Sequence, residues 1–144
     1  MTPSEFTEGV ARLRAIPLFS SLSDDALRRV ASVACELEVP AGHVLIQPDL
    51  EGSGIFVLEE GTAVVELPGE DVVCGPGEFV GELALLAEGV RHSARVRAST
   101  PLRCLAINRR DFAELLEDEP RIAVAMLPVL AHRLAETDRM LGKR

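Results

Sequence analysis

The sequence predicts a mainly β domain with helices at both ends, and three observations carry this prediction. From residue 35 to residue 107, short apolar stretches separated by turns recur about every 8 to 12 residues, as strands of an antiparallel sandwich or barrel do. Before and after this region, the apolar residues recur at helical spacing. The chain has 144 residues, 47% of them hydrophobic, which suits one core and a single domain over residues 1–144.

Two helices are expected within residues 1–34. The first covers residues 4–15, because its apolar side chains recur every three or four positions. Pro17 ends it. The second helix starts after Ser23, a favourable N-cap residue, and Asp24 suits the positive end of the helix dipole. The apolar positions of the first helix are Phe6, Val10, Leu13 and Ile16.

The β region is expected over residues 35–107. Its strands are predicted at residues 36–40, 43–47, 55–58, 62–67, 71–74, 93–98 and 102–107. Glycines stand at the turns between them, where we expect positive φ angles, at positions 42, 54, 61, 75, 77 and 81.

Residues 108–142 are expected to form two more helices. Asn108 is the predicted cap of the first, with Asp111 at the capping-box position. Pro120 suits the first turn of the second, which is expected to reach about residue 141. Pro128 lies inside this final helix and is expected to bend it, because proline lacks an N–H and crowds the preceding turn.

The final helix also carries a heptad seam, which predicts a homodimer. Its spacing alternates between four and three residues through Ala123, Leu127, Leu130, Leu134, Thr137 and Leu141. A second apolar face, formed by Ile122, Met126 and Val129, is available for packing within the chain's own domain. Because the helix has two apolar faces, we favour a helix that packs on its own domain with one face and on a second copy of the chain with the other. The alternative is a helix that packs on its own domain alone.

Composition excludes several classes of protein. No apolar run approaches the ~20 residues of a membrane span, and the N-terminus lacks the basic-then-apolar order of a signal peptide. The three cysteines, Cys35, Cys74 and Cys104, are isolated and odd in number, which argues against a disulfide framework or a metal cluster. We therefore expect a cytoplasmic protein with reduced cysteines. The net charge of -8 argues against a general nucleic-acid binder.

The charges are unevenly distributed along the chain. Residues 30–90 hold twelve acidic residues and no Lys or Arg, and residues 91–110 hold six arginines and no acid. Solvated strand faces account for three of the arginines, Arg103, Arg109 and Arg110. The other three, Arg91, Arg95 and Arg97, adjoin the stretch 79–94. For these, two roles are open: a solvated strand face, or the attraction of an anionic ligand.

The stretch 79–94 contains the residues that predict a ligand-binding site. Gly81 and Glu82 open a short apolar run, and such a glycine-opened helical turn presents free N–H groups and a positive dipole end to an anion. Glu82 would repel an anion, so it is expected to accept a hydrogen bond from a neutral hydroxyl. A phosphate and a sugar hydroxyl together suggest a nucleotide.

This stretch resembles the phosphate-binding cassette of the cyclic-nucleotide-binding domain family. Residues 81–86, Gly-Glu-Leu-Ala-Leu-Leu, and the closing pair Ser93-Ala94 match that cassette. The resemblance implies an antiparallel β-roll (a double-stranded β-helix or jelly roll) over residues 35–107. It also implies a regulatory module, because the segment from Pro17 onward looks like the family's N-terminal helices, which carry movement outward.

The resemblance also assigns roles within the cassette. Glu82 would accept from the ribose 2′-hydroxyl, and Gly81, Leu83, Ser93 and Ala94 would donate backbone N–H groups to the cyclic phosphate. The remaining implied ligand-binding residues are Phe79, Val80, Ala84 and Arg91.

One position departs from the family pattern, because His92 stands where the family has its phosphate-binding Arg. A neutral imidazole donates from one nitrogen only, so the affinity loss is on the order of tenfold. Binding would survive if the bound phosphate favours protonated His92, or if Arg91 or Arg95 takes the role. His92 as a loop residue without a ligand role is the alternative.

The final helix resembles the catabolite activator branch of the family. Residues 132–138 fall at the spacing of its Arg-Arg-Leu-x-x-Thr-Ser motif, with Glu82 and Thr137 55 positions apart. Carried over, Arg133 would approach Glu82, and Thr137 would meet the adenine amino group. Asp138 replaces the Ser that reaches the adenine from the partner subunit. Thr137 as a register-setting residue of a coiled coil is equally open.

The sequence therefore predicts a non-enzymatic cyclic-nucleotide sensor that binds cAMP, with cGMP as the second ligand, and that needs no metal or other cofactor. The alternative is a homologous dimerisation or interaction module that binds no nucleotide or binds it weakly. A cupin-like metalloenzyme is disfavoured, because its histidines would have to be His43, His92 and His132, which are scattered. No helix-turn-helix follows, so we expect no DNA binding by this chain alone. The output partner is open, as is whether the chain is a whole protein.

Overall fold

The computed structural model describes residues 3–47, 54–67, 69–81 and 94–142, and the side chains within them from residue 9 to residue 136. The chain falls into two compact units. Met1–Ala31 and Leu115–Arg144 form a helical unit, and Ser32–Glu114 form a β unit. Within the described ranges, no helix is long and apolar enough to cross a membrane.

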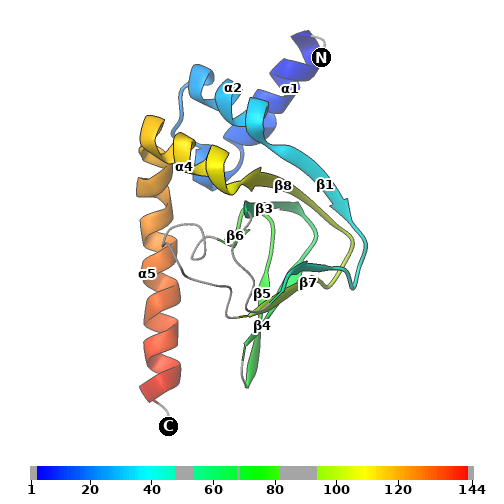
Figure 1. Cartoon of the computed structure of the whole chain (residues 1–144), viewed down its shortest axis with the longest axis vertical. Helices are drawn as coiled ribbons and strands as arrows, with labels where there is room; N and C mark the ends of the chain where they lie inside the picture. Colours follow the sequence, from blue (N-terminus) through cyan, green and yellow to red (C-terminus); the bar gives the residue numbers. More distant parts are fainter. Residues whose placement is uncertain (1–2, 48–53, 68, 82–93, 143–144) are drawn as a thin grey trace. The chain divides into compact units, whose positions relative to one another are not determined.

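The described residues of the β unit form two antiparallel sheets of four strands each, which confirms the predicted fold class (Figure 1). The first sheet has the order β1-β8-β3-β6, and the second has the order β2-β7-β4-β5. The strands are β1 (Cys35–Val39), β2 (Val44–Ile46), β3 (Gly54–Glu60), β4 (Ala63–Leu67), β5 (Glu70–Cys74), β6 (Phe79–Val80), β7 (Arg95–Ala98) and β8 (Leu102–Asn108).

An apolar cluster of described residues joins the two sheets. In the first sheet, Cys104 of β8 lies opposite Leu58 of β3 and Leu37 of β1, and all three side chains belong to or pack against this cluster. The second sheet adds residues from all four of its strands. The buried members of the cluster are Val39, Ile46, Leu58, Ala63, Cys74, Val80, Val96, Ala98, Leu102 and Cys104. Alternate strand residues thus face one shared core, as strands of period two require.

Some predicted turns differ in the structure. β3 runs through Glu60, whereas the predicted strand ended at residue 58, and its pairing with β8 is irregular between Leu58 and Glu60. The expectation of positive φ is wrong for Gly54 and Gly75. Gly54 has a different reason to be glycine, because a Cβ there would lie 2.6 Å from the carbonyl oxygen of Ile107 on β8.

The helical unit contains the N-terminal helices and most of the C-terminal ones. Its elements are α1 (Pro3–Arg14), the 3-10 turn η1 (Pro17–Phe19), most of α2 (Asp24–Val33), the end of α4 (Arg109–Asp118) and α5 (Arg121–Gly142). The predicted cap is confirmed, because Ser23 Oγ accepts from the N–H of Ala26 at 3.2 Å. Arg121 of α5 donates to the carbonyl oxygen of Ser21 at 3.1 Å. This bond ties the long helix to the loop before α2.

The predicted cap of α4 is also present. The N–H of Asp111 donates to Asn108 Oδ1 at 2.8 Å, and Asn108 Nδ2 donates to Asp111 Oδ2 at 2.8 Å. Pro120 lies just before the first residue of α5, one position earlier than predicted. α5 continues through Pro128 without a break in its helical assignment.

Candidate functional site

The chain reaches the predicted cassette through a tight turn that is bonded to β3. The N–H of Gly75 donates to Glu78 Oε2 at 2.5 Å, and the N–H of Glu78 donates to the Gly75 carbonyl at 3.1 Å. Gly77, with φ of 88°, donates to the Leu58 carbonyl at 2.7 Å, and the Leu58 N–H donates to the Glu78 carbonyl at 2.8 Å. The turn is therefore held to β3, one of the two inner strands of the first sheet.

The cassette itself begins in β6 and at Gly81. Phe79 and Val80 are buried, with 2% and 4% of their surfaces exposed, and they pair with Val57 and Phe56 of β3. Gly81 has a φ of 94°, which confirms the predicted turn, and a Cβ there would lie 2.7 Å from the Gly54 carbonyl oxygen. Phe79 and Val80 thus anchor the start of the cassette in the core, and Gly81 is fixed by backbone sterics.

The cassette ends at the second sheet. Ala94 is half-buried and directly precedes β7. Val96 and Ala98 of β7 are buried in the shared core, so by alternation Arg95 and Arg97 lie on the opposite face of the sheet. The two ends of the cassette therefore belong to different sheets.

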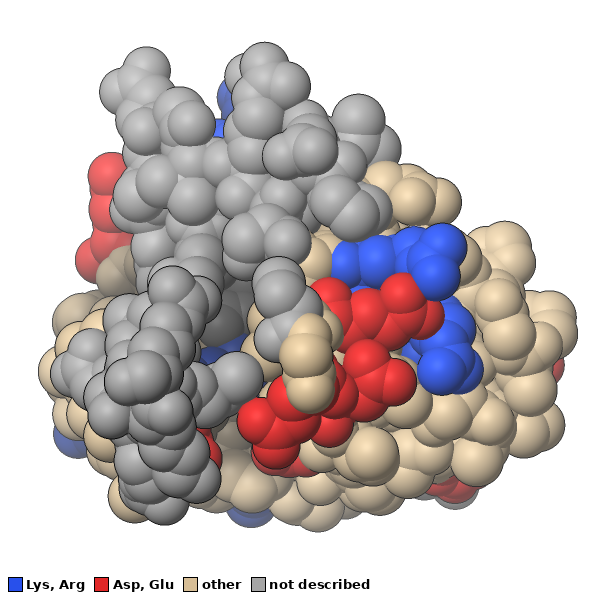
Figure 2. Space-filling view, turned by 90° about the horizontal axis from the view of Figure 1, so that it is seen from below, with Lys and Arg blue, Asp and Glu red and all other residues tan. Residues whose placement is uncertain are grey.

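Glu66 of β4 binds both arginines on that face. Arg95 donates to Glu66 Oε2 from Nε at 3.0 Å and from Nη2 at 2.7 Å, and Arg97 Nε donates to Glu66 Oε1 at 2.7 Å. These bonds, first those of Arg95 and then that of Arg97, lower the pKa of the Glu66 carboxyl below its ordinary value. Acidic side chains also lie directly beside basic ones in the space-filling view (Figure 2). Of the two interpretations left open for Arg95 and Arg97, the structure favours a strand-face role. We call these three residues the Glu66 clamp.

The other predicted site residues are placed less completely. Glu82, Leu83, Ala84, Arg91, His92 and Ser93 lie outside the described residues. Arg133 is half-buried on α5, in the helical unit. The backbone of Thr137 is helical, but its side chain lies outside the described part.

Two cavities are lined by described residues, and none of those residues belongs to the predicted site. One, of about 450 Å³, lies at the ends of β1 and β8. The other, of about 210 Å³, is lined by Val33, Cys35, Gly54, Phe56, Ala106, Ile107 and Asn108. Among the described residues, no group of three His, Cys, Asp or Glu side chains is placed to hold a metal ion.

Residues 36–119 match the model of the cyclic nucleotide-binding domain. The chain belongs to this family. The match runs from the second residue of β1 to just past the capped helix α4, and it includes the cassette between β6 and β7. A cyclic nucleotide-binding domain is a regulatory module, which agrees with the regulatory role predicted for this domain.

Individual relatives agree with this assignment. The domain is 34% identical over 119 residues to a cyclic nucleotide-gated potassium channel of Rhizobium etli, covering 83% of this chain and 33% of the channel. It thus spans about a third of the length of the curated channels it matches.

Solved structures match as well. The crystal structure of the catabolite activator protein of Thermus thermophilus is 29% identical, with a TM-score of 0.73, over 88% of this chain and 62% of that one. A PKAR CBD2 domain with bound Sp-2Cl-cAMPS has a TM-score of 0.77 over 99% of this chain and 94% of that one. At 19% identity, the second match shows the shared fold alone.

Proposed function

We propose that this domain is a sensor of cyclic nucleotide, with cAMP as its first ligand and cGMP as its second. The observation that carries the proposal is the position of the cassette motif. Residues 81–86 and Ser93-Ala94 have the family's spacing and run between β6 of one sheet and β7 of the other. Ligand-dependent movement of this connection would act on both sheets at once.

The chemistry of the proposed site follows the residues of the cassette. Backbone N–H groups at Gly81, Leu83 and Ser93 suit a cyclic phosphate, and Glu82 suits the ribose 2′-hydroxyl. The preference for cAMP rests on Thr137, at the spacing of the adenine-binding position of catabolite activators, and on the similarity to the Thermus protein. Arg133 would complete the ribose–phosphate side.

His92 sets the affinity in this proposal. With Arg95 and Arg97 bound to Glu66, neither is a ready substitute for the missing phosphate-binding arginine. His92→Arg is expected to tighten cAMP binding about 5- to 30-fold, because a charge-assisted, forked hydrogen-bond donor replaces a neutral one.

Calorimetric titration of wild type, His92→Arg and His92→Arg/Glu82→Gln with cAMP, cGMP and 5′-AMP tests the proposal. We expect cAMP to bind tightest to His92→Arg and the added Glu82→Gln to weaken it, because the ribose hydroxyl loses a charged acceptor. The noncyclic nucleotide is the control. Absence of cAMP and cGMP binding to wild type and to His92→Arg at millimolar concentration would contradict the sensor function.

A second candidate function, a dimeric interaction module, rests on α5. Three of its large apolar side chains are strongly exposed, Val124 at 64%, Leu127 at 61% and Leu134 at 64%. Ala131 is also exposed, so the stripe has heptad spacing. We propose that this stripe forms a homodimer, which is compatible with either function. Signal output through the terminal helices to another domain or protein belongs to the same proposal.

A further inference from the structure

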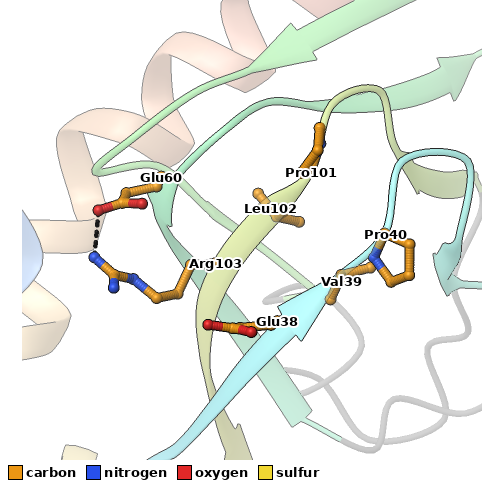
Figure 3. Close-up of a pocket in the computed structure, with 7 residues that line it drawn as sticks. All are labelled: Glu38, Val39, Pro40, Glu60, Pro101, Leu102 and Arg103. Carbon is orange, nitrogen blue, oxygen red and sulfur yellow. Dashed lines mark hydrogen bonds and ion pairs between the residues drawn. The ribbon is translucent and has the colours of Figure 1, made fainter.

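The described strands form two sheets with four edges, and these edges differ in how open they are. Proteins commonly close a strand edge with a short strand, irregular pairing, charge or proline. β6 has only two residues, and β2 has three with irregular pairing between Val44 and Ile46. β1 bears the exposed Glu38 and is followed by Pro40 (Figure 3). β5 has five residues in regular register with β4, so its edge is the most open of the four.

β5 also exposes apolar side chains. Val72 and Val73 are 40% and 63% exposed, whereas the other strongly exposed large apolar side chains of the described residues lie on α5. Cys74, at the end of β5, is buried in the shared core. Strand alternation therefore assigns Val72 to the core side of the sheet and Val73 to the outer side. A strand added at this edge would cover an exposed valine on each face.

Hydrogen bonds at the next strand show which backbone groups of β5 face the open edge. The N–H of Ser99, just after β7, donates to the carbonyl oxygen of Thr62, just before β4, at 3.0 Å. Alternate residues of β4 point their backbone groups to opposite neighbours, so residues 63, 65 and 67 point to β5. Their partners in the register are residues 70, 72 and 74, which leaves Asp71 and Val73 with N–H and C=O groups directed to the open edge. On that side β5 has no neighbour among the described strands.

The charges on β5 are all negative. Glu70 and Asp71 are exposed, and β5 contains no basic residue. Asp71 lies opposite Glu66, which is itself bound to Arg95 and Arg97. Neither Glu70 nor Asp71 is ion-paired with a described residue. A basic side chain on an added strand, opposite Asp71, would therefore be favourable.

We propose that β5 binds an extended segment of a partner protein as an additional antiparallel strand. Asp71 and Val73 each exchange two backbone hydrogen bonds with this segment. From its N-terminus, the segment places an apolar residue opposite Val73, another opposite Val72 and a basic residue opposite Asp71. A second copy of β5 is a poorer occupant, because it would bring the acidic residues of two copies onto adjacent strands. This surface is separate from the proposed nucleotide function and does not depend on it.

The test uses the whole chain, 15N-labelled, titrated with the peptide acetyl-Thr-Val-Val-Lys-Lys-amide and followed by amide chemical shifts and hydrogen exchange. In the free protein, the amides of Asp71 and Val73 are expected to exchange quickly, and that of Val72, which is bonded to β4, slowly. Millimolar peptide is expected to shift the amides of β5 saturably. At nine-tenths saturation, exchange at Asp71 and Val73 should be about ten-fold slower, because it then proceeds from the remaining free protein.

Three further peptides separate strand addition from non-specific contact. N-methylation of the first valine removes the N–H that would donate to the Val73 carbonyl, and it is expected to abolish binding. N-methylation of the second valine is the matched control and should leave binding intact, because that N–H would point away from β5. The acidic peptide acetyl-Thr-Val-Val-Glu-Glu-amide is expected to leave the amides of β5 unmoved, because it repels Glu70 and Asp71.

Variants of β5 localise the effect. Val73→Pro lacks the outward N–H and is expected to abolish binding while the bonds to β4 remain, since proline is tolerated at an edge whose N–H faces solvent. Val73→Thr keeps this N–H and a high strand propensity, so it should still bind. Asp71→Asn, which leaves the backbone unchanged, should weaken binding of the lysine peptide about three-fold, in the range of a cross-strand ion pair.

Several outcomes would overturn the proposal. These are equal binding of the two N-methylated peptides, equal shifts with the basic and the acidic peptide, or amides of β5 that stay unmoved at millimolar lysine peptide. Protection of Asp71 and Val73 that rises with protein concentration, without peptide, would identify a second copy as the occupant and would overturn it too.

Discussion

The three cysteines differ in environment, although from the sequence all three were expected to be isolated, reduced residues. Cys104 is fully buried, and its pKa is raised to about 11, first by burial and then by the charges of Glu59 and Cys35. Cys74 is also buried, whereas Cys35 is exposed at the start of β1. A thiol reacts as the thiolate, so both protonation and access protect Cys104.

We expect a thiol reagent such as DTNB at about pH 8 to label one cysteine quickly in the native protein and all three after unfolding in guanidinium. Cys35→Ser should remove the fast phase and leave the two slow thiols. Fast labelling of a second cysteine in folded protein would contradict the burial of Cys74 or Cys104.

The Glu66 clamp predicts a defined pH dependence. The Glu66 carboxyl has a pKa below its ordinary 4.5 in the folded state, so the unfolded state binds more protons as the pH falls. The stabilisation by Glu66 is therefore fully present above that ordinary value and is lost as the pH falls through the lowered folded pKa.

Urea unfolding of wild type and Glu66→Gln checks this expectation. Wild type should be more stable near pH 7, and the difference should shrink steadily below about pH 4.5. Glu70→Gln, an exposed carboxylate on the neighbouring strand, is the control that should show no such trend. A gap between wild type and Glu66→Gln that stays constant down to about pH 3 would contradict the role of Arg95 and Arg97.

At the level of elements, α5 carries the prediction about assembly. Leu127→Glu combined with Leu134→Glu should place two charges on the exposed stripe and yield a monomer in sedimentation, with the β unit folded by circular dichroism. His132→Glu, an exposed position beside the stripe, should leave the dimer intact. A wild-type chain that is monomeric at high micromolar concentration would contradict the dimer.

The same helix shows what the sequence could predict and what it could not. The heptad spacing located Leu127 and Leu134, but two registers share these positions. The structure leaves Ala123 and Leu130 partly buried and exposes Val124 and Ala131 instead. Which of the two registers is exposed depends on which side of the helix packs inward. Ile122 and Met126 are buried, so their side is the inner one. Periodicity alone does not contain that information.

The strands give a similar lesson. Turn residues and alternation placed seven of them, whereas β6, with two residues, is too short for any periodic signal. The Glu66 clamp could not be predicted from the sequence, because it depends on the register between β4 and β7. In that register Glu66 lies opposite Arg95, which is 29 positions away in the chain. The capped helix starts were predictable, because a cap and its partner are separated by only three residues.

For the whole molecule, the proposed function predicts stabilisation by ligand. At free cAMP a hundred times the dissociation constant, mass action adds about 2.7 kcal/mol to the free energy of unfolding. The unfolding temperature should therefore rise by several degrees, more at a given concentration for His92→Arg than for wild type. Differential scanning fluorimetry with cAMP, and with adenosine as control, measures this shift. An equal shift with adenosine would contradict recognition of the cyclic phosphate.

The strand order has a consequence for how the chain folds. Of the neighbouring strand pairs in the two sheets, only β4 and β5 are adjacent in the chain. Cys35 pairs with Ala106 and Val44 with Arg97, so both sheets close between distant segments. Contacts of this kind must overcome the entropy of closing long loops, which places folding in the millisecond-to-second range. The β4–β5 hairpin can form within about 10 μs, before the pairs between distant strands form. The two ends of the cassette belong to strands of different sheets, so both ends reach their native positions only when both sheets have closed.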